Sequence, residues 1–341
     1  MITKVHIEST NESRQINSAG GMNAHEYLYQ AILRSSNDHI TITDNPSDAS
    51  LIIFAESHKD PRPGQPDAST RVRRHPIYRQ FTSKCIIHNG ADRPNPVVPG
   101  LYPSIPRKWA KRLCCLGAPY LAHLNPYIDQ ALPDDREPEL TAGFMGSCAR
   151  KPLRKLLLTL SAGQGWENIE FQDTTDQFVG SLRRQDMEGH AELKKLFVEQ
   201  ILNSRFVLCP AGAGPSSYRL YEAMRCGRSP VIISECWTPP QGPSWESFAI
   251  MVHPSRAREL PKILNAAEGR WKELGINART EWERHYHPDV LGRELVQLAM
   301  RVLDLQPYEN TMRRIAARGF TAGQPFSVKI CTKLQRRFSR G

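Results

Sequence analysis

The chain has no apolar run that approaches the roughly 20 residues needed for a helix to cross a bilayer. Its first ten residues, MITKVHIEST, also lack the apolar core of a signal peptide, so we expect a cytoplasmic protein. Eight cysteines occur, but none belongs to a C-x-x-C pair or shows a zinc spacing with histidine. We therefore expect reduced, mostly buried thiols rather than a disulfide framework or a zinc site.

Acidic residues are missing from positions 311–341, which carry eight basic residues. The other 310 residues therefore contribute only about +2 of the net charge of +10. Apolar residues recur every four positions in this segment, at Phe326, Ile330, Leu334 and Phe338. The pattern predicts a basic amphipathic tail over 306–341 that binds an anionic membrane surface, with packing on the protein's own body as the alternative. Nucleic acid is not an expected partner, because the tail has neither an aromatic platform nor a groove-reading motif.

The length of 341 residues is enough for two domains. The composition, with 40% hydrophobic and 23% charged residues, is typical of a soluble globular protein. Short apolar runs alternate with helical patterns, which predicts an α/β fold. Strands are expected at 3–7, 49–55, 85–88, 141–146, 169–172, 206–208, 230–233 and 248–252, and helices at 25–35, 153–160, 190–203, 257–267 and 278–286.

The stretch 108–116 is expected to form a helix or a strand. A segment rich in proline and acid follows at 129–139 and is the expected interdomain linker. This organisation predicts an N-terminal domain at 1–135, a C-terminal domain at 136–305 and the tail from 306.

The most informative segment is 203–233, NSRFVLCPAGAGPSSYRLYEAMRCGRSPVII. Its first apolar residues predict a buried strand, and the glycines and prolines from Pro210 through Gly212 to Pro215 predict a loop. A helix and a further strand are expected to follow. A glycine-rich turn that leads into a helix offers backbone N–H groups, which suits a phosphate.

Four side chains of this segment have expected roles. Ser216 or Ser217 is expected to cap the helix. Arg219 is expected close to the phosphate position, inside the first turn. Glu222, one turn later, can accept hydrogen bonds from vicinal hydroxyls such as those of a ribose.

Pattern alone also fits an ordinary βαβ unit whose glycines only form a turn. The residue order, however, resembles the C-terminal signature of the exostosin-type glycosyltransferases, F-x-L-x-P-x-G-x-x-x-x-S-x-R-x-x-E-A, then a Gly and P-V-I. The matching residues are Phe206, Leu208, Pro210, Gly212, Ser217, Arg219, Glu222, Ala223, Gly227, Pro230, Val231 and Ile232. A weaker resemblance extends the similarity to residues 20–270. It departs from the family pattern at Asn45 and Ser50.

The resemblance implies the GT-B architecture, in which two Rossmann-like domains face a cleft. It implies that the segment holds a nucleotide-sugar donor, with Arg219 on the diphosphate and Glu222 on the ribose. Pro210, Gly212 and the two serines at 216 and 217 would form the rest of the donor loop.

A second loop is expected at the donor site. Gly146 ends a predicted strand and is followed by a run of basic residues. The family has a similar glycine followed by an arginine, for which Arg154 is the best match and Arg150 a second candidate. The alternative is that these bases form the solvated face of an amphipathic helix.

No D-x-D triplet occurs in the chain. Glycosyltransferases that neutralise the leaving diphosphate with a metal usually carry one, because carboxylates are hard oxygen ligands. We therefore expect metal-independent transfer without a cofactor, in which arginine, the helix dipole and backbone N–H groups stabilise the leaving group.

Transfer with inversion requires a general base that accepts the proton of the acceptor hydroxyl. The base is expected from the N-terminal domain, at the ends of its strands. The candidates are Asp92, Glu56, His58 and His88, of which Asp92 is favoured. His25 is a candidate contact for the sugar or the acceptor.

These features predict an inverting glycosyltransferase that uses a UDP-sugar. The expected acceptor is a glycan or lipid-linked glycan of surface polysaccharide or glycoconjugate synthesis, reached at the inner face of the membrane. Two alternatives stay open: a noncatalytic subunit of a glycosyltransferase complex, and a fucosyltransferase-like enzyme that uses GDP-fucose. Retention of both Arg219 and Glu222 argues against the noncatalytic subunit.

Overall fold

The structure is a computed structural model. It describes residues 2–10, 23–36, 39–56, 64–109, 114–122, 125–132, 137–149, 151–184 and 186–318. Internal contacts divide the chain into two units, Met1–Gln306 and Pro307–Gly341. His58, Arg150 and the four apolar residues of the predicted tail lie outside the described residues.

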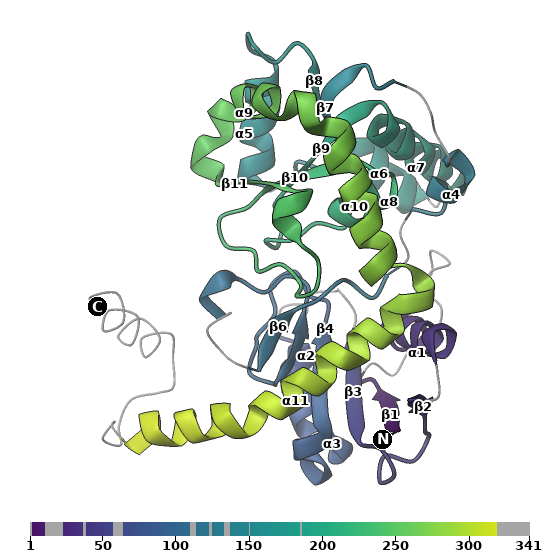
Figure 1. Cartoon of the computed structure of the whole chain (residues 1–341), viewed down its shortest axis with the longest axis vertical. Coiled ribbons are helices and arrows are strands. Elements are labelled where there is room, and N and C mark those ends of the chain that lie inside the picture. Colours follow the sequence, from purple (N-terminus) through teal and green to yellow (C-terminus); the bar gives the residue numbers. More distant parts are fainter. Residues whose placement is uncertain are drawn as a thin grey trace. The chain divides into compact units, whose positions relative to one another are not determined.

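The first sheet is parallel throughout and has the order β2-β1-β3-β4-β5-β6 (Figure 1). Its strands are β1 (Thr3–Glu8), β2 (Ile40–Ile42), β3 (Leu51–Glu56), β4 (Cys85–Asn89), β5 (Gly100–Tyr102) and β6 (Cys115–Gly117). Its helices are α1 (Ala24–Ser35), α2 (Ala68–Arg74) and α3 (Pro76–Gln80), with short 3-10 turns at Thr82–Lys84 and Arg107–Trp109.

The second sheet is also parallel, with the order β11-β10-β9-β7-β8. Its strands are β7 (Leu140–Gly146), β8 (Ile169–Asp173), β9 (Ser204–Pro210), β10 (Ser229–Ile233) and β11 (Ile250–Val252). The accompanying helices are α4 (Ile128–Ala131), α5 (Pro152–Ser161), α6 (Thr175–Arg184), α7 (Met187–Leu202), α8 (Arg219–Arg225), α9 (Leu260–Ala267) and α10 (Trp271–His285). The predicted α/β class with two Rossmann-like sheets is therefore confirmed.

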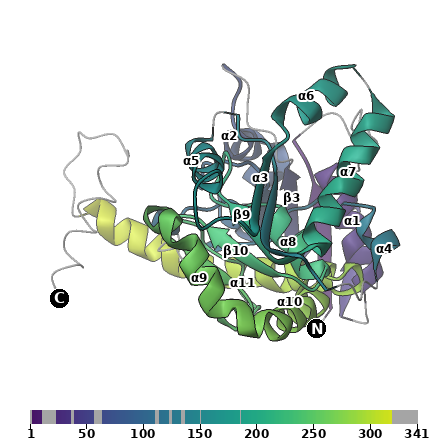
Figure 2. The same ribbon diagram turned by 90° about the horizontal axis from the view of Figure 1, so that it is seen from above.

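Both sheets are buried on their two faces. In β3, Ile53 belongs to one apolar cluster and Phe54 to another. In β9, Phe206 and Leu208 pack in a cluster with residues of α5 and α9, whereas Val207 packs in a cluster with residues of α7 and α8. Figure 2 shows helices around the strands of this second sheet. Parallel strands covered on both faces are nearly continuous apolar runs, which explains why each predicted strand overlaps an observed one.

The stretch 108–116, expected to be one helix or strand, instead contains the end of a 3-10 turn and the start of β6. Strands β2 and β5 were not predicted, because a strand of three residues is too short to show a pattern. The cysteines follow the prediction, since six of the seven that the structure describes are buried. Burial raises the pKa of Cys85, Cys209 and Cys226 to about 12.

A long helix, α11 (Pro288–Arg318), was not predicted. A Cβ placed on Gly292 of α11 would lie 2.2 Å from the backbone oxygen of Ala31 in α1. Farther along, Gln306 Nε2 donates to the backbone oxygen of Cys85 in β4 at 3.2 Å. Gly292, which the sequence placed in the C-terminal domain, and Gln306, which it placed at the start of the tail, therefore contact elements of the first sheet. The predicted domain boundaries stay a prediction.

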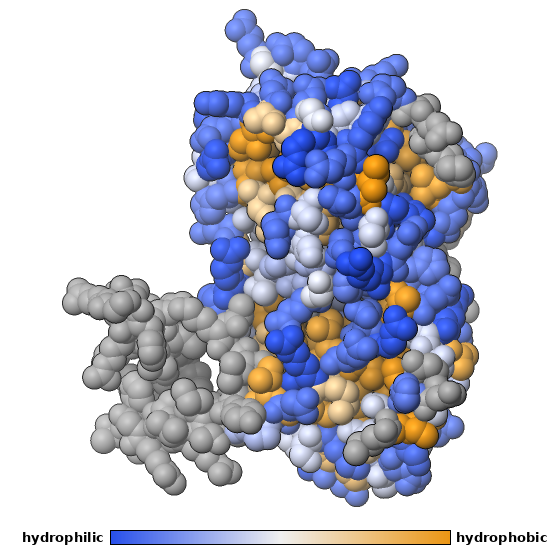
Figure 3. Space-filling model, viewed as in Figure 1, coloured by the Kyte–Doolittle hydropathy of each residue, from blue (hydrophilic) through white to orange (hydrophobic). Residues whose placement is uncertain are grey.

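Over the described residues, no helix combines the length and apolar character that crossing a bilayer requires. On the face shown in Figure 3, hydrophilic residues predominate and hydrophobic ones appear as separate patches.

Candidate active site

The carboxyl ends of β7 and β9 form the centre of the candidate site. From β7 the chain moves to β8 on one side and then returns to β9 on the other side of β7. Parallel α/β sheets bind ligands at such a reversal of strand order, outside the carboxyl ends of the strands. Gly146 and Pro210, which both belong to the predicted donor loops, end these two strands.

Arg219 is the first residue of α8, and its side chain reaches the end of β7. Its guanidinium donates to the backbone oxygen of Met145 and lies 4.6 Å from the centre of the Phe144 ring. Burial lowers the pKa of Arg219, and the negative charge of Glu222 opposes this shift. A Cβ placed on Gly146 would lie 3.1 Å from Arg219 Nη2, so glycine gives the guanidinium room at the strand end.

Arg154 of α5 reaches the same place from the other predicted loop. Its Nη1 donates to the Ser147 backbone oxygen at 3.0 Å, and its Nη2 donates to the Pro210 backbone oxygen at 3.1 Å. The residue is only 9% exposed, and its guanidinium lies 5.2 Å from the Phe144 ring centre. Arg154 therefore does not belong to a solvated helix face.

The charges of Glu222 and Asp92 only partly oppose the effect of burial on the two arginines, whose pKa values stay lowered. Burial, and next the neighbouring Arg219, lower the pKa of Arg154 to about 10. Among the described residues neither arginine forms an ion pair, and Arg154 Nε has no hydrogen-bond partner. Two buried like charges disfavour each other, and a bound anion would offset both the repulsion and the loss of water. This arrangement suits a diphosphate.

Lys151 is a third cation here, which the sequence analysis did not single out. Its Nζ lies 3.4 Å from the Ser147 backbone oxygen. Burial lowers its pKa, and Arg154 lowers it further. The run of basic residues after Gly146 was the only hint of this role in the sequence. The fold is needed to show that Lys151 lies at the candidate site.

The glycine-rich loop forms a tight turn, in which Gly212 N donates to the Gly214 oxygen at 3.0 Å. A Cβ placed on Gly212 would lie 2.9 Å from Arg154 Nη2, so the loop and the guanidinium approach closely. Ser216 is 5% exposed, and its Oγ has no hydrogen-bond partner in the described part of the chain. Ser217, by contrast, is half-buried.

The prediction that Ser216 or Ser217 caps the helix is wrong. The N-cap is Tyr218, and no side chain makes a capping hydrogen bond. The helix begins later than expected because Pro215 and the residues after it continue the loop. Consequently Arg219 is the first helical residue rather than one in the middle of the first turn.

Glu222 lies one turn along α8. Its Oε1 accepts a hydrogen bond from the backbone N–H of Asn125 at 3.1 Å. Burial raises the pKa of Glu222, and Arg219 opposes this shift. Asn125, which the sequence analysis missed, thus helps to orient the carboxylate. The contact of Glu222 with a ribose stays a prediction.

Asp92 follows β4 of the first sheet and approaches the glycine-rich loop of the second. A Cβ placed on Gly214 would lie 2.4 Å from the backbone oxygen of Asp92. The negative charge of Asp92 acts on Lys151 and Arg154, because in both it opposes the lowering of the pKa by burial. The structure therefore brings the favoured base candidate to the donor loops.

Glu56 has a different environment. One carboxylate oxygen accepts a hydrogen bond from Thr10 N at 2.7 Å, and the other pairs with Arg71 Nη2 at 2.9 Å. These contacts hold the buried carboxylate in place, and its removal would deprive the half-buried Arg71 of its ion-pair partner. A role as general base stays a prediction that this geometry does not favour.

Two of the histidine candidates, His88 and His25, each form a hydrogen bond with a backbone oxygen. His88 Nε2 lies 2.9 Å from the Pro119 oxygen, and burial lowers the pKa of His88 to about 4. His25 Nε2 lies 3.2 Å from the Ile7 oxygen at the first sheet. Neither is among the residues that line the pocket at the donor loop.

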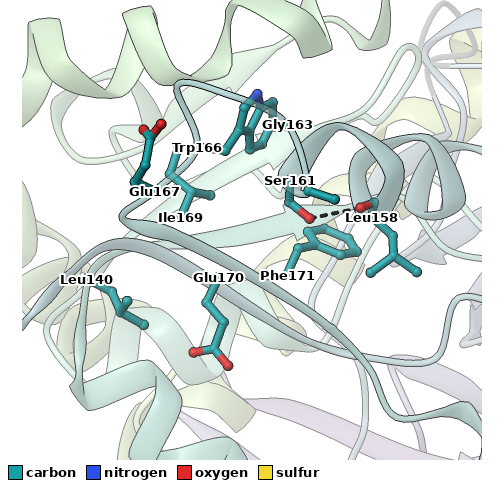
Figure 4. A pocket seen from close by; sticks show the side chains of 10 residues that line it. Leu140, Leu158, Ser161, Gly163, Trp166, Glu167, Ile169, Glu170 and Phe171 are labelled. Atoms are coloured by element: carbon teal, nitrogen blue, oxygen red, sulfur yellow. Dashed lines mark hydrogen bonds between the residues drawn. The ribbon is translucent and has the colours of Figure 1, made fainter.

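A pocket of about 700 Å³ adjoins the glycine-rich loop. Segments that follow strands of both sheets line it, including Asp92, Arg93, Lys108, Trp109, Gly212, Gly214 and Glu235. A second pocket, of about 480 Å³, lies at the amino ends of β7 and β8 (Figure 4). Its lining includes Leu140, Trp166 and Glu170 but none of the predicted site residues, so it has no part in the candidate site. Within the described ranges, no group of three or more His, Cys, Asp or Glu residues could hold a metal ion.

Part of the chain is similar to known proteins. Residues 108–267 match the family described as Exostosin GT47 domain. The chain is 31% identical over 110 residues to an exostosin-1 homolog of Caenorhabditis elegans, a match that covers 31% of this chain and 29% of the relative. It is 28% identical over 131 residues to a probable glycosyltransferase of Arabidopsis thaliana, covering 37% of this chain and 22% of the relative.

Two solved structures are also similar, at low TM-scores. The crystal structure of Anabaena HepE in complex with UDP shows 12% identity and a TM-score of 0.38, covering 90% of this chain and all of HepE. A glycosyltransferase from Rickettsia africae shows 9% identity and a TM-score of 0.42, covering 89% of this chain and 98% of that one.

Residues 108–267 are therefore similar to the exostosin GT47 domain, which agrees with the resemblance predicted from the sequence. The chain spans less than a third of the length of these curated relatives. The weaker resemblance before residue 108 lies outside the family match.

Proposed function

We propose that this chain is an inverting glycosyltransferase that moves a sugar from a nucleotide sugar to a glycan acceptor. The observation that carries the proposal is the cluster of Lys151, Arg154 and Arg219 at the strand reversal of the second sheet. These cations have backbone oxygens as hydrogen-bond partners, so their charges stay available for a diphosphate. The preference for UDP follows from the resemblance to the family.

The proposed reaction uses these groups as follows. The acceptor hydroxyl oxygen forms a bond to the anomeric carbon of the sugar, and the bond from that carbon to the diphosphate breaks. The two arginines stabilise the charge that develops on the leaving diphosphate, without reorganising, because the Phe144 ring and backbone oxygens already hold them. The proton of the acceptor hydroxyl passes to Asp92.

Nucleotide binding tests the proposal directly. We expect titration calorimetry of the purified chain to detect UDP or a UDP-sugar, and thermal-shift screening against UDP-, GDP- and CMP-sugars to show the largest stabilisation with a UDP-sugar. A preference for GDP-fucose would favour the fucosyltransferase-like alternative. Absence of binding to all three nucleotide classes by a folded chain would favour a noncatalytic subunit and contradict the proposal.

Transfer is expected to survive EDTA. The reason is that the arginine pair can supply the positive charge that a metal supplies elsewhere. The measurement is the transfer rate before and after chelation, with added manganese as the control. Complete loss of activity that manganese restores would show that a metal stabilises the leaving group.

The lipid-linked or surface-glycan acceptor, the cytoplasmic location at the inner membrane face and the membrane contact of the tail stay proposals. Residues 319–341, which carry the apolar stripe of that tail, lie outside the described part of the chain.

A further inference from the structure

Two of the three cations at the candidate site share one backbone oxygen. Arg154 Nη1 lies 3.0 Å from the Ser147 oxygen, and Lys151 Nζ lies 3.4 Å from the same atom. Arginine and lysine side chains have many rotamers, so an anchor near the charged end decides where the charge is held. The direction of the Ser147 carbonyl therefore matters for the position of both charges.

We propose that Asp173 and Thr175 are positioning residues for the diphosphate of the donor. They hold the N–H end of the peptide group whose C=O end holds Arg154 and Lys151. This inference rests on the proposed function, and it assigns a role to two residues that act through the loop 147–149.

The pairing of β7 with β8 brings the two loops together. Gly146 at the end of β7 is in register with Asp173 at the end of β8, so the chain leaves both strands at the same edge of the sheet. Beyond the strands, Thr174 N donates to the Gly146 oxygen at 3.2 Å. Residues 147–149 therefore start out alongside residues 173–175.

The hydroxyl of Thr175 is oriented by Asp173 and faces the neighbouring loop. Thr175 Oγ1 lies 2.5 Å from Asp173 Oδ1 and donates its single proton there. Its lone pairs then face donors of the loop: the N–H groups of Cys148 at 3.1 Å and Ala149 at 3.3 Å, and the Ser147 hydroxyl at 3.1 Å. One threonine thus contacts three successive residues of the loop.

Asp173 gives the loop a charged acceptor. Its Oδ1 accepts from Cys148 N at 3.1 Å and from Thr175 N at 2.9 Å, besides the threonine hydroxyl. Partial burial raises the pKa of Asp173, but the hydrogen bonds from Thr175 and Cys148 outweigh this effect and the pKa is lowered. The carboxylate is therefore ionised at neutral pH, and hydrogen bonds to an ionised acceptor are stronger than those to a neutral one.

The planarity of the peptide bond transmits this hold to the cations. The C=O of Ser147 and the N–H of Cys148 belong to one peptide group, and in a trans peptide they point in opposite directions. Cys148 is 1% exposed, and its N–H is shared between Asp173 Oδ1 and Thr175 Oγ1. Because these two acceptors fix the N–H, the Ser147 oxygen is fixed on the other side.

Calorimetry of the full chain with UDP as the probe tests the inference. Thr175→Val keeps the shape of the side chain and removes its three contacts with the loop, so we expect UDP to bind about tenfold more weakly. Thr175→Ser restores the hydroxyl and should return the affinity to within about twofold of the wild type. Thr159→Val is the matched control, because the exposed Thr159 hydroxyl bonds only to the Lys155 oxygen of its own helix.

Asp173→Asn gives a second test, in which the direction of the effect decides. Asp173 acts on Lys151 as a negative charge, since it opposes the lowering of the pKa of Lys151 by burial. If charge alone mattered, removing it would strengthen UDP binding. A positioning role requires the opposite, and we expect UDP to bind about threefold more weakly, because a neutral amide holds the Thr175 hydroxyl and the Cys148 N–H less firmly.

Thermal melting identifies the variants that are folded, and Asp173→Asn decides if Thr175→Val does not fold. Unchanged UDP affinity in folded Thr175→Val, failure of Thr175→Ser to restore a lost affinity, or affinity in Asp173→Asn equal to or above that of the wild type overturns the positioning role. Each of these results leaves the proposed function intact. If the wild-type chain binds neither UDP nor GDP nor CMP, the proposed function fails, and the positioning role fails with it.

Discussion

Arg219→Ala is expected to lower the rate of sugar transfer about a hundredfold, which corresponds to a loss of about 3 kcal/mol of transition-state stabilisation. The reason is that the Met145 backbone oxygen and the Phe144 ring hold Arg219 at the end of β7, next to the position that we propose for the leaving diphosphate. Arg219→Lys should also be slow, since a single ammonium cannot reproduce the planar guanidinium that stacks on Phe144. The measurement is kcat/KM for the donor at a fixed acceptor concentration.

The matched control is Arg270→Ala. Arg270 is exposed and forms a surface ion pair with Glu273 at 3.1 Å, a pair that contributes little to stability. Its replacement should leave transfer within about twofold of the wild type. Turnover close to the wild-type value in correctly folded Arg219→Ala would remove Arg219 from the donor site.

Much of the fold could be predicted because a strand buried on both faces is a run of apolar residues in the sequence. In β3 the residues from Leu51 to Phe54 are all apolar and all buried, so the strand appears as one run. The short strand β5 leaves no such mark. Its Gly100 is fixed by a neighbour far away in sequence, since a Cβ there would lie 2.1 Å from the Ile87 oxygen.

Helix α11 shows a signal that was present but not used. Leu291, Leu295, Ala299 and Val302 are buried and have helical spacing. The predicted tail was started at residue 306 because the end of the chain is basic. The helix instead starts at Pro288 and continues past residue 306. The charge of a segment indicates how exposed it is to solvent, whereas the spacing of its apolar residues indicates where a helix begins and ends.

Some residues of the candidate site could likewise be predicted from the sequence, and others could not. Arg219, Glu222 and Gly212 belong to one contiguous signature, so a single segment of sequence was enough to group them. Lys151 and Asn125 could not be assigned from sequence, because their roles depend on tertiary contacts. The bond from Asn125 to Glu222, for instance, joins residues 97 positions apart.

Gly214→Ala is the second substitution with a large expected effect. Its Cβ would lie 2.4 Å from the Asp92 oxygen and 2.7 Å from Ser104 Oγ, so the donor loop and the loop after β4 must move apart. A displacement of about 1 Å between reacting groups can lower a rate about a hundredfold, so we expect transfer to fall by about tenfold to a hundredfold. The crowding should also lower the free energy of unfolding by about 1–3 kcal/mol. Steady-state kinetics and denaturant unfolding measure the two effects.

The backbone angles of Gly214 are not the cause of this effect, since the positive φ angles among the described glycines occur at Gly64, Gly165, Gly227 and Gly242. Gly269→Ala provides the control, because a Cβ at Gly269 meets no atom within 4 Å and its φ is not positive. That variant should keep wild-type transfer and stability, so any loss specific to Gly214→Ala reports on the contacts of Gly214 with Asp92 and Ser104. If Gly214→Ala transferred sugar and unfolded like the wild type, the loop of Asp92 would not form a wall of the donor site, and Asp92 would lose its place as the proton acceptor.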